Sequence, residues 1–286
     1  MSGVFLNMPL PVRPSSLFFM TKTLTVLGLL LLAGCSAHGP WVSSSQEEWA
    51  GKQQPEAQVE HTFLLIGDAG KAHANDPVMQ LVEARIEAAE SPVDVVWLGD
   101  NIYPDGMLEP EHADRPEAEA HLLAQLEAGK TARQQFLIPG NHDWNSSGAG
   151  GWEAVVRQEE FVETHLGRDA WLPNNGCPGP EFVELDNQRV LIVLDSQWWV
   201  HPEETPEYAG SPCANQTEHM VLYRLERGLQ QYRDRQVLVV AHHPLYSNGA
   251  HGDTYTLEDH LFPTLLFGSN LYIPMPLLGS AYPLLR

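Results

Sequence analysis

Four short polar blocks follow, in order, four runs of apolar residues that are typical of β-strands. The blocks are Gly67-Asp68-Ala69-Gly70, Gly99-Asp100-Asn101-Ile102-Tyr103, Gly140-Asn141-His142-Asp143 and Ala241-His242-His243-Pro244. Because parallel strands that end at one edge of a sheet bring their following residues together, we expect five side chains to meet there: Asp68, Asp100, Tyr103, Asn141 and His242. Oxygen donors together with an imidazole indicate a metal site of the hard-to-borderline kind.

The two aspartates and the tyrosine predict a site for two ions. Asp68 and Asp100 each follow a glycine, which alone is common turn chemistry, but the two pairs are spaced like the ends of one βαβ unit. One shared Asp can bridge two ions about 3.5–4 Å apart. Tyr103 is either a packed aromatic residue or a phenolate ligand. Phenolate ligation favours a trivalent ion, because such a charge lowers the phenol pKa of about 10 far enough.

The third and fourth blocks add candidate ligands and a candidate general acid. We expect Asn141 to be a neutral oxygen ligand that also contacts substrate, and His142 to protonate a leaving oxygen near neutral pH. Asp143 is expected to orient His142, although an Asx-type turn is the alternative for this block. His242 is the predicted ligand, and His243 is expected to line the substrate pocket, since adjacent residues of an extended chain point in different directions.

The residues between the blocks predict the elements that position them. The predicted strands are Phe63–Ile66, Val93–Leu98, Phe136–Ile138, Phe182–Leu185, Val190–Leu194 and Gln236–Val240, and the predicted helices are 77–89, 116–128, 152–164 and 217–233. Asp76 before Pro77 is the expected N-cap of the first helix. Strands that alternate with helices, followed by a hairpin, predict one layered α/β (α+β) domain over residues 61–260.

The net charge limits the partners of this chain. The 286 residues carry a formal charge of −21, with 43% hydrophobic residues. Such a charge argues against binding nucleic acid, because few cations are present to replace the counterions of the phosphates. A small phosphorylated substrate would also be repelled at long range. Bound metal ions would have to reverse this field locally.

The N-terminal residues predict export. Lys22 precedes an apolar run, 24–33, that is shorter than the roughly 20 residues of a membrane-spanning helix, and the run ends in Leu32-Ala33-Gly34-Cys35. This pattern resembles a bacterial lipoprotein signal over residues 1–34, with a start at Met20 giving a well-proportioned signal. The alternative is an ordinary secretory signal in which Cys35 is incidental.

The lipoprotein interpretation predicts the location of the mature protein. Cys35 would carry the lipid anchor, and the polar residues 35–60 would tether the domain to the membrane of a bacterial cell envelope. Ser36 resembles the signal for the outer membrane, with the domain facing the periplasm or the surface. In an oxidising compartment the even pair Cys177 and Cys213 favours a disulfide, with two free buried thiols as the alternative.

Taken in order, the four blocks resemble those of the calcineurin-like metallophosphoesterase superfamily. Tyr103, together with Gly70 where the superfamily's commoner first motif has histidine, resembles the purple acid phosphatase branch. The resemblance implies a β-sandwich with flanking helices and a binuclear centre. One ion, Fe(III), would bind Asp68, Asp100 and Tyr103. The other ion, Fe, Zn or Mn, would share Asp100 and bind Asn141 and His242.

The resemblance also implies a reaction and one departure from the family pattern. The implied reaction is hydrolysis of phosphate monoesters by a metal-activated hydroxide, with His251 resembling a substrate-binding histidine. The family's fifth block, Gly-His-x-His, does not occur in this sequence, so we expect 261–286 to be the start of an incomplete C-terminal portion. The alternatives are a phosphodiesterase or nucleotidase, and a non-catalytic exported binding or assembly module that retains the fold.

Overall fold

The computed structural model describes residues 59–202, 205, 210–245, 257, 261–264 and 272–275. The predicted signal segment, Cys35 and His251 lie outside the described residues, as do most of the predicted tether and of the expected C-terminal portion. No helix in the described part of the chain combines the length and the apolar character that a membrane span requires.

In the described residues, six strands form two sheets of three strands each. The first sheet is parallel, in the order β1-β2-β3: β1 (Thr62–Ile66), β2 (Val93–Trp97) and β3 (Gln134–Leu137). The second sheet has the order β4-β5-β6: β4 (Glu181–Glu184), β5 (Arg189–Val193) and β6 (Gln236–Val240). In the second sheet β4 runs antiparallel to β5, whereas β6 runs parallel to β5. Each predicted strand is therefore present, within two residues of its expected bounds.

Helices form where the sequence predicts an apolar stripe and a cap. They are α3 (Pro77–Glu87), α4 (Arg115–Ala128), α5 (Gly151–Leu166), the short α6 (Gln197–Val200) and α7 (Glu218–Gln231), with 3-10 turns η1 (Asn145–Ser147) and η2 (Asn174–Gly176). Asp76 is the N-cap of α3, because its side chain accepts a hydrogen bond from the Val78 N–H at 2.7 Å. The sequence analysis missed α6, which is too short to show a helical period.

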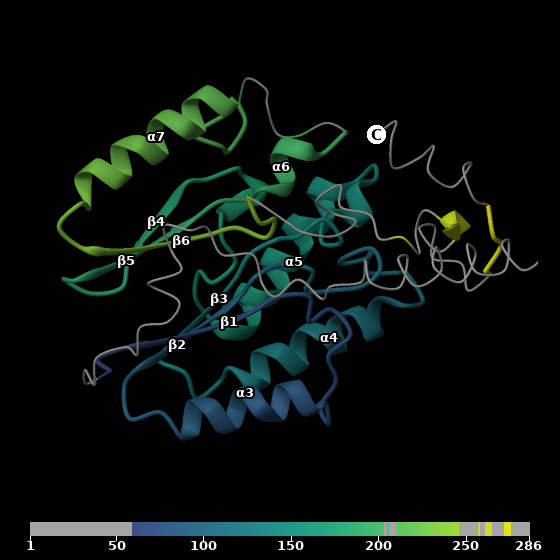
Figure 1. Cartoon of the computed structure of the whole chain (residues 1–286), viewed down its shortest axis with the longest axis horizontal. Helices are drawn as coiled ribbons and strands as arrows, with labels where there is room; N and C mark the ends of the chain where they lie inside the picture. The colour runs from purple at the N-terminus through teal and green to yellow at the C-terminus, as the bar shows by residue number, and fades with distance from the viewer. Residues whose placement is uncertain are drawn as a thin grey trace, which may run out of the picture. The chain divides into compact units, whose positions relative to one another are not determined.

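The two sheets pack face to face between layers of helices (Figure 1). Buried residues of α3, α4 and α5 pack against one face of the first sheet around Val95 and Trp97. Val96, Phe136, Leu191 and others fill the space between the two sheets. On the outer face of the second sheet, α7 covers a smaller cluster. The predicted layered α/β fold, a sandwich with flanking helices, is confirmed.

One expectation about the sheets is wrong. The sequence analysis placed the strands before all four polar blocks in one parallel sheet, but β6, which precedes His242, belongs to the second sheet. β6 nevertheless ends beside the first sheet, because Nδ1 of His242, two residues after β6, lies 2.8 Å from the carbonyl oxygen of Leu98, which directly follows β2. A strand sequence specifies its faces and length but not which sheet it joins. The candidate site therefore lies where the ends of two sheets meet.

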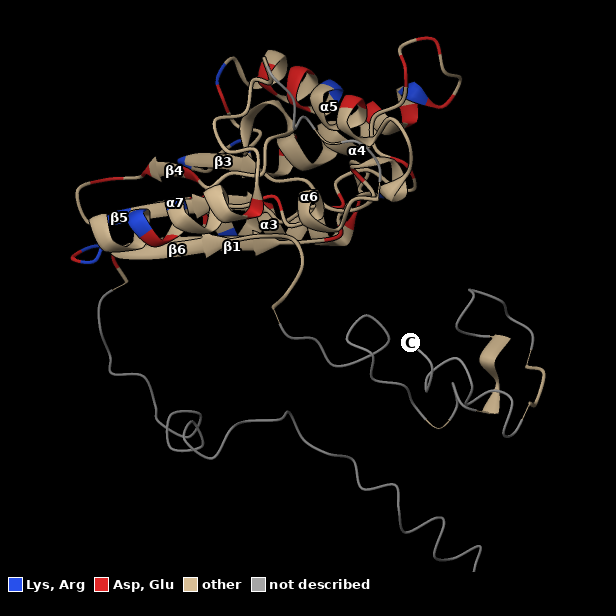
Figure 2. Ribbon diagram, turned by 90° about the horizontal axis from the view of Figure 1, so that it is seen from above, with Lys and Arg blue, Asp and Glu red and all other residues tan. Residues whose placement is uncertain are grey.

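Acidic residues are spread over the helices and loops, with few Lys and Arg between them (Figure 2). This distribution fits the net charge of −21. A strong excess of negative charge repels anions at long range, so any anion site must be built by local cations.

A disulfide between Cys177 and Cys213 joins the segment after η2 to the segment before α7. Of the two alternatives left by the sequence, the structure therefore has the bonded one. Its sequence separation of 36 residues predicts a stabilisation of about 2–4 kcal/mol through the lost freedom of the unfolded chain.

We expect the double variant Cys177→Ser, Cys213→Ser to unfold at lower urea concentration than the wild type. The expected loss is about 2–4 kcal/mol in the free energy of unfolding, measured under oxidising conditions. A reducing agent should destabilise the wild type by a similar amount and leave the double variant unchanged. Equal stability of the two proteins without reductant would contradict the structural role of this disulfide.

Candidate metal centre

Three oxygen atoms from the first two polar blocks form one group of donors. The Tyr103 hydroxyl lies 3.0 Å from Asp68 Oδ1 and 3.0 Å from Asp100 Oδ2. Asp68 follows β1 and Asp100 follows β2, and these strands are adjacent and in parallel register up to Ile66 and Trp97. The structure thus brings together the residues predicted to share the first ion. We call these three atoms the phenol group.

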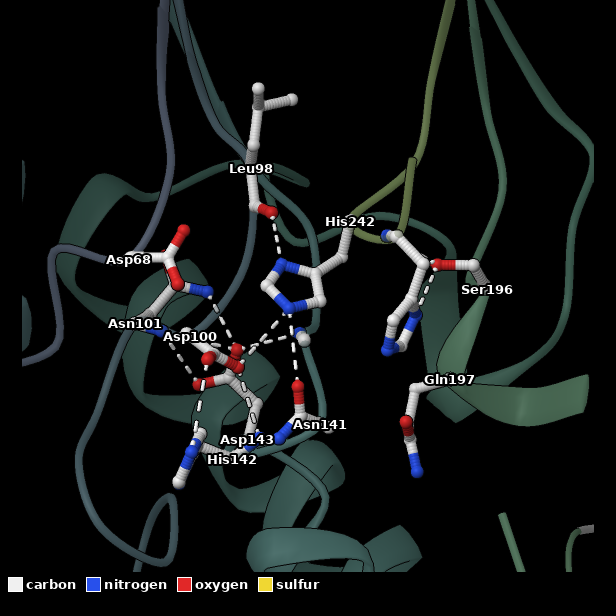
Figure 3. A network of polar contacts seen from close by, with 12 residues as sticks. Asp68, Leu98, Asp100, Asn101, Asn141, His142, Asp143, Ser196, Gln197 and His242 are labelled. Atoms are coloured by element: carbon white, nitrogen blue, oxygen red, sulfur yellow. Dashed lines mark hydrogen bonds and ion pairs between the residues drawn. The ribbon is translucent and has the colours of Figure 1, made fainter. Parts of the chain in front are cut away.

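A second group of donors shares Asp100 with the first. His242 Nε2 lies 3.3 Å from Asn141 Oδ1 and 3.5 Å from Asp100 Oδ1. Figure 3 shows His242 between the carbonyl of Leu98 and the side chain of Asn141, with Asp100 beside them. We call these three atoms the imidazole group. Since Asp100 presents Oδ2 to the phenol group and Oδ1 to the imidazole group, its carboxylate lies between the two.

Both groups have the spacing that a bound cation requires. Metal–ligand distances of about 2.0–2.2 Å at tetrahedral or octahedral angles place neighbouring ligand atoms about 3 Å apart, as observed here. No group of three or more His, Cys, Asp or Glu side chains in the described part of the chain is arranged to hold a metal ion. The absence of such a cluster from the described residues is consistent with the two groups described here. Each group contains only two side chains of these four types, and its third donor atom comes from a phenol or an amide.

The orientation of His242 leaves one nitrogen available for an ion. Its Nδ1 lies 2.8 Å from the carbonyl oxygen of Leu98, which can only accept a hydrogen bond, so Nδ1 carries the proton. In the neutral ring Nε2 then presents a lone pair towards Asn141 Oδ1 and the carboxylate of Asp100. Three acceptor atoms that face one another repel unless a cation lies between them, so the imidazole group fits a metal ion.

Two of the candidate ligands have an uncommon backbone conformation. Asp68 has φ of 59° and Asp100 has φ of 55°, both in the left-handed region. Aspartate tolerates this region better than most residues, but the conformation still costs of order 1 kcal/mol and is frequent at functional sites. Each aspartate reverses the chain directly after its strand, which directs both carboxylates towards Tyr103.

Glycines allow the blocks to approach one another closely. A Cβ atom at Gly140 would lie 2.4 Å from Asp100 Oδ1 and 2.9 Å from His242 Cε1, and one at Gly99 would lie 2.7 Å from His242 Nδ1. A Cβ at Gly70 would lie 2.7 Å from the Tyr103 nitrogen. The sequence analysis quoted these glycines as parts of the blocks but missed their role, which is to leave room for the ligands.

The prediction that Asp143 orients His142 is wrong. Asp143 is fully buried and accepts hydrogen bonds from the backbone N–H groups of Gly140, Asn101 and Ile102 and from the Asn101 side chain. It therefore fixes the second polar block against the third. The reason is the chain direction: Asp143 points inward beneath the loops, whereas His142 faces the ligand side. Burial raises the pKa of Asp143 to about 7, and the N–H donors oppose that shift.

His142 is held by backbone and hydroxyl groups. Its Nδ1 lies 2.5 Å from the carbonyl of Pro104 and 3.1 Å from Ser146 Oγ, and its ring packs edge-on against Tyr103 with centroids 4.4 Å apart. Its Nε2 lies 4.0 Å from Asp100 Oδ2. Because the carbonyl requires a proton on Nδ1, Nε2 is the nitrogen that can give or take a proton beside the phenol group.

His243 lies beside the site, and sequence reasoning missed the residues that hold it. Ser196 Oγ is 2.9 Å from His243 Nδ1 and accepts a hydrogen bond from the His243 N–H. Asp195, fully buried, accepts from Trp144 Nε1 at 2.8 Å. Burial raises the pKa of Asp195 to about 7. Asp195 and Ser196 come just after the apolar strand β5. Polar residues after an apolar strand are the sequence signal that identified the other blocks, so the same signal could have identified these two.

The phenol group is electrostatically unfavourable for a phenolate without a cation. Burial raises the pKa of the Tyr103 hydroxyl, and the carboxylates of Asp100 and Asp68 raise it further. A multivalent cation at this position would reverse the effect, because it stabilises the phenolate and both carboxylates together.

Comparison with known proteins identifies the family of this chain. The family model "Calcineurin-like phosphoesterase" matches residues 61–271. Purple acid phosphatase 4 of Arabidopsis thaliana is 25% identical over 210 residues, which are 71% of this chain and 58% of the relative. Purple acid phosphatase 17 of the same plant is also 25% identical, over 208 residues that cover 71% of this chain and 58% of the relative. The chain thus spans less than two thirds of these relatives.

One solved structure that matches this chain is described as "GAP50 the anchor in the inner membrane complex of Plasmodium". The match covers 66% of this chain and 57% of the chain in that structure, with 19% sequence identity. Its TM-score is 0.39, and nothing further rests on it. The family match covers the four polar blocks and both sheets. The chain belongs to the calcineurin-like phosphoesterase family, and the purple acid phosphatases are relatives that it resembles.

Proposed function

We propose that this protein hydrolyses phosphate monoesters with two metal ions bound at the shared carboxylate of Asp100. The observation that carries this proposal is the placement of the phenol group and the imidazole group on opposite oxygens of Asp100. Asp68 and Tyr103 would complete the donors to one ion, and Asn141 and His242 those to the other. The family and the purple acid phosphatase relatives support metal-dependent hydrolysis of phosphate esters in general.

When bound, the two ions supply Lewis acidity that offsets phosphate charge and lowers the pKa of water. The chain's own residues bind and orient the reactants. Asn141 lies at the edge of the imidazole group, where its amide also reaches a phosphate oxygen. Since Nδ1–H is hydrogen-bonded to the Pro104 carbonyl, only the protonated imidazolium form of His142 carries a second proton, on Nε2; that form would donate it to the leaving oxygen and return to the neutral ring. His243, hydrogen-bonded to Ser196, has its ring beside that of His242 with centroids 4.9 Å apart and would line the pocket there.

The export predicted from the N-terminus is part of this proposal. The disulfide between Cys177 and Cys213 supports an oxidising compartment, and attachment to a bacterial envelope through Cys35 agrees with it. An external location would give the enzyme access to phosphate esters outside the cytoplasm.

Hydrolysis of a simple aryl phosphate by the purified chain tests the function. We expect activity that a chelator removes and that added iron together with zinc or manganese restores. The chelated protein should keep its circular dichroism spectrum, because the hydrogen bonds of Asp143 hold the loops without a metal ion. Full activity in the metal-free protein, or none in the reloaded protein, would reject the proposal.

We expect the variant Tyr103→Phe to show whether iron or another metal binds at the phenol group. If Fe(III) binds there, the wild type shows a phenolate-to-iron absorption band in the visible range, and the variant loses it because the phenylalanine ring has no oxygen. The neighbouring aromatic variant Tyr232→Phe, whose hydroxyl contacts Glu184 on the second sheet, serves as the control and should keep the band. A visible band of equal strength in Tyr103→Phe would contradict this assignment.

A further inference from the structure

A basic cavity of about 380 Å³ lies at the amino end of β3, and thus at the opposite end of this strand from the metal centre. Its wall contains four basic side chains and one acidic one: Lys130, Arg133, His165, Arg168 and Glu127. In a chain with a net charge of −21, a local excess of basic groups requires a reason.

Arg168 is the residue that ordinary ion pairing does not explain. Its guanidinium donates to the backbone carbonyls of Gln135 at 2.6 Å and Asp169 at 3.1 Å, and it lies 5.6 Å from the ring centroid of Phe136. Within the described part of the chain Arg168 forms no ion pair, and the other Lys and Arg residues without such a partner are exposed. Burial lowers the pKa of Arg168, and the carboxylate of Asp94, which pairs directly with Arg133, only partly opposes that shift.

The helix ends account for part of the basic wall but not for Arg168. Lys130 follows α4 and pairs with Glu127, and His165 lies in the last turn of α5, where a cation offsets the helix dipole. Arg133 donates to the buried carboxylate of Asp94, through Nε at 2.9 Å. The N–H groups of Arg168 instead point to a carbonyl of β3 and to its neighbour Asp169.

We propose that this cavity binds a phosphate-type oxyanion, with Arg168 as the main contact. A guanidinium binds such an anion through paired N–H groups, and Lys130 and His165 provide further donors at the rim. An oxyanion with three or four oxygens can accept from all of them, whereas a carboxylate has only two oxygens. The volume accommodates a single oxyanion or a small phosphate ester.

The site is separate from the metal centre. Gln135, on β3, lines the cavity, and Gly140 follows it by five residues, which at about 3.3 Å per residue of extended chain is about 16 Å. One small anion cannot contact both ends of the strand. The proposal therefore does not depend on the phosphoesterase function, and either can fail without the other.

Calorimetric titration with inorganic phosphate tests this site. The full chain is first treated with a chelator, so that metal ions cannot contribute to binding. We expect one phosphate per wild-type chain, about tenfold weaker binding in Arg168→Gln, and a severalfold loss in Lys130→Gln. Arg85→Gln removes an exposed cation outside the cavity and should bind like the wild type.

Two further measurements keep the result decisive. If Arg168→Gln unfolds more easily in urea, the result for Lys130→Gln decides, because the Lys130 side chain and its ion-pair partner Glu127 are both exposed. Sedimentation with phosphatidylglycerol vesicles separates the sources of the anion: vesicle binding that Arg168→Gln abolishes identifies a lipid headgroup, and phosphate binding without vesicle binding identifies a soluble oxyanion. No phosphate or vesicle binding by the wild type, or equal binding by both cavity variants, overturns the proposal.

Discussion

Asp100→Asn is expected to abolish metal binding at both donor groups and to lower kcat for phosphate ester hydrolysis at least about a thousandfold. This corresponds to about 4 kcal/mol of transition-state stabilisation. Both Asp100 oxygens face donor atoms of other residues, Oδ2 facing Tyr103 and Oδ1 facing His242. An amide keeps one oxygen but loses the charge and the second oxygen, so it cannot serve two cations.

The same substitution should leave the fold intact. Asp100 Oδ1 also accepts a hydrogen bond from the backbone N–H of His142 at 3.0 Å, and the oxygen of asparagine can replace it. Metal content measured by elemental analysis, together with thermal unfolding, separates loss of ions from loss of structure. Asp76→Asn, which removes an equal charge but keeps the N-cap of α3, is the matched control and should hydrolyse at the wild-type rate. Two ions per chain and normal kcat in Asp100→Asn would refute the bridging role of this residue.

Gly140→Ala is expected to lower activity about a hundredfold or more, although Gly140 contributes no donor atom. The new Cβ would lie 2.4 Å from Asp100 Oδ1, 2.5 Å from the Asp100 nitrogen and 2.9 Å from His242 Cε1. Two of these atoms belong to Asp100, and one of them is a backbone atom, so the third block must move away. We expect a loss of about 1–3 kcal/mol in the free energy of unfolding and weaker metal binding at the imidazole group.

Gly67→Ala provides a control of the same chemistry. Gly67 is directly next to Asp68, yet a Cβ there would meet only Leu98 Cβ at 3.7 Å, an ordinary contact. Its kcat and metal content should stay within about twofold of the wild type, because the site gains no steric conflict. Similar losses in both variants would show that any side chain in these loops is harmful, and the steric explanation for Gly140 would then fail.

The candidate ligands could be predicted because their signals are local. Each lies directly after an apolar strand, and Asp68, Asp100 and Tyr103 come together because β1 and β2 are adjacent and parallel. Asp76 as a helix cap could be predicted for the same reason, since the residues that it caps are its neighbours in sequence. The roles of Asp143 and Asp195 could not be predicted from neighbouring residues, because some of their hydrogen-bond partners are up to about fifty residues away in sequence.

The sequence by itself determined the strands, the helices, the family resemblance and the chemical types of the candidate ligands. Only the tertiary structure decided that β6 joins a second sheet, that Asp143 fixes loops rather than His142, and that Arg168 has no carboxylate partner in the described part of the chain. The physical reason is that periodicity and turn residues act over a few neighbours, whereas sheet membership, side-chain direction and charge pairing depend on which distant segments pack together.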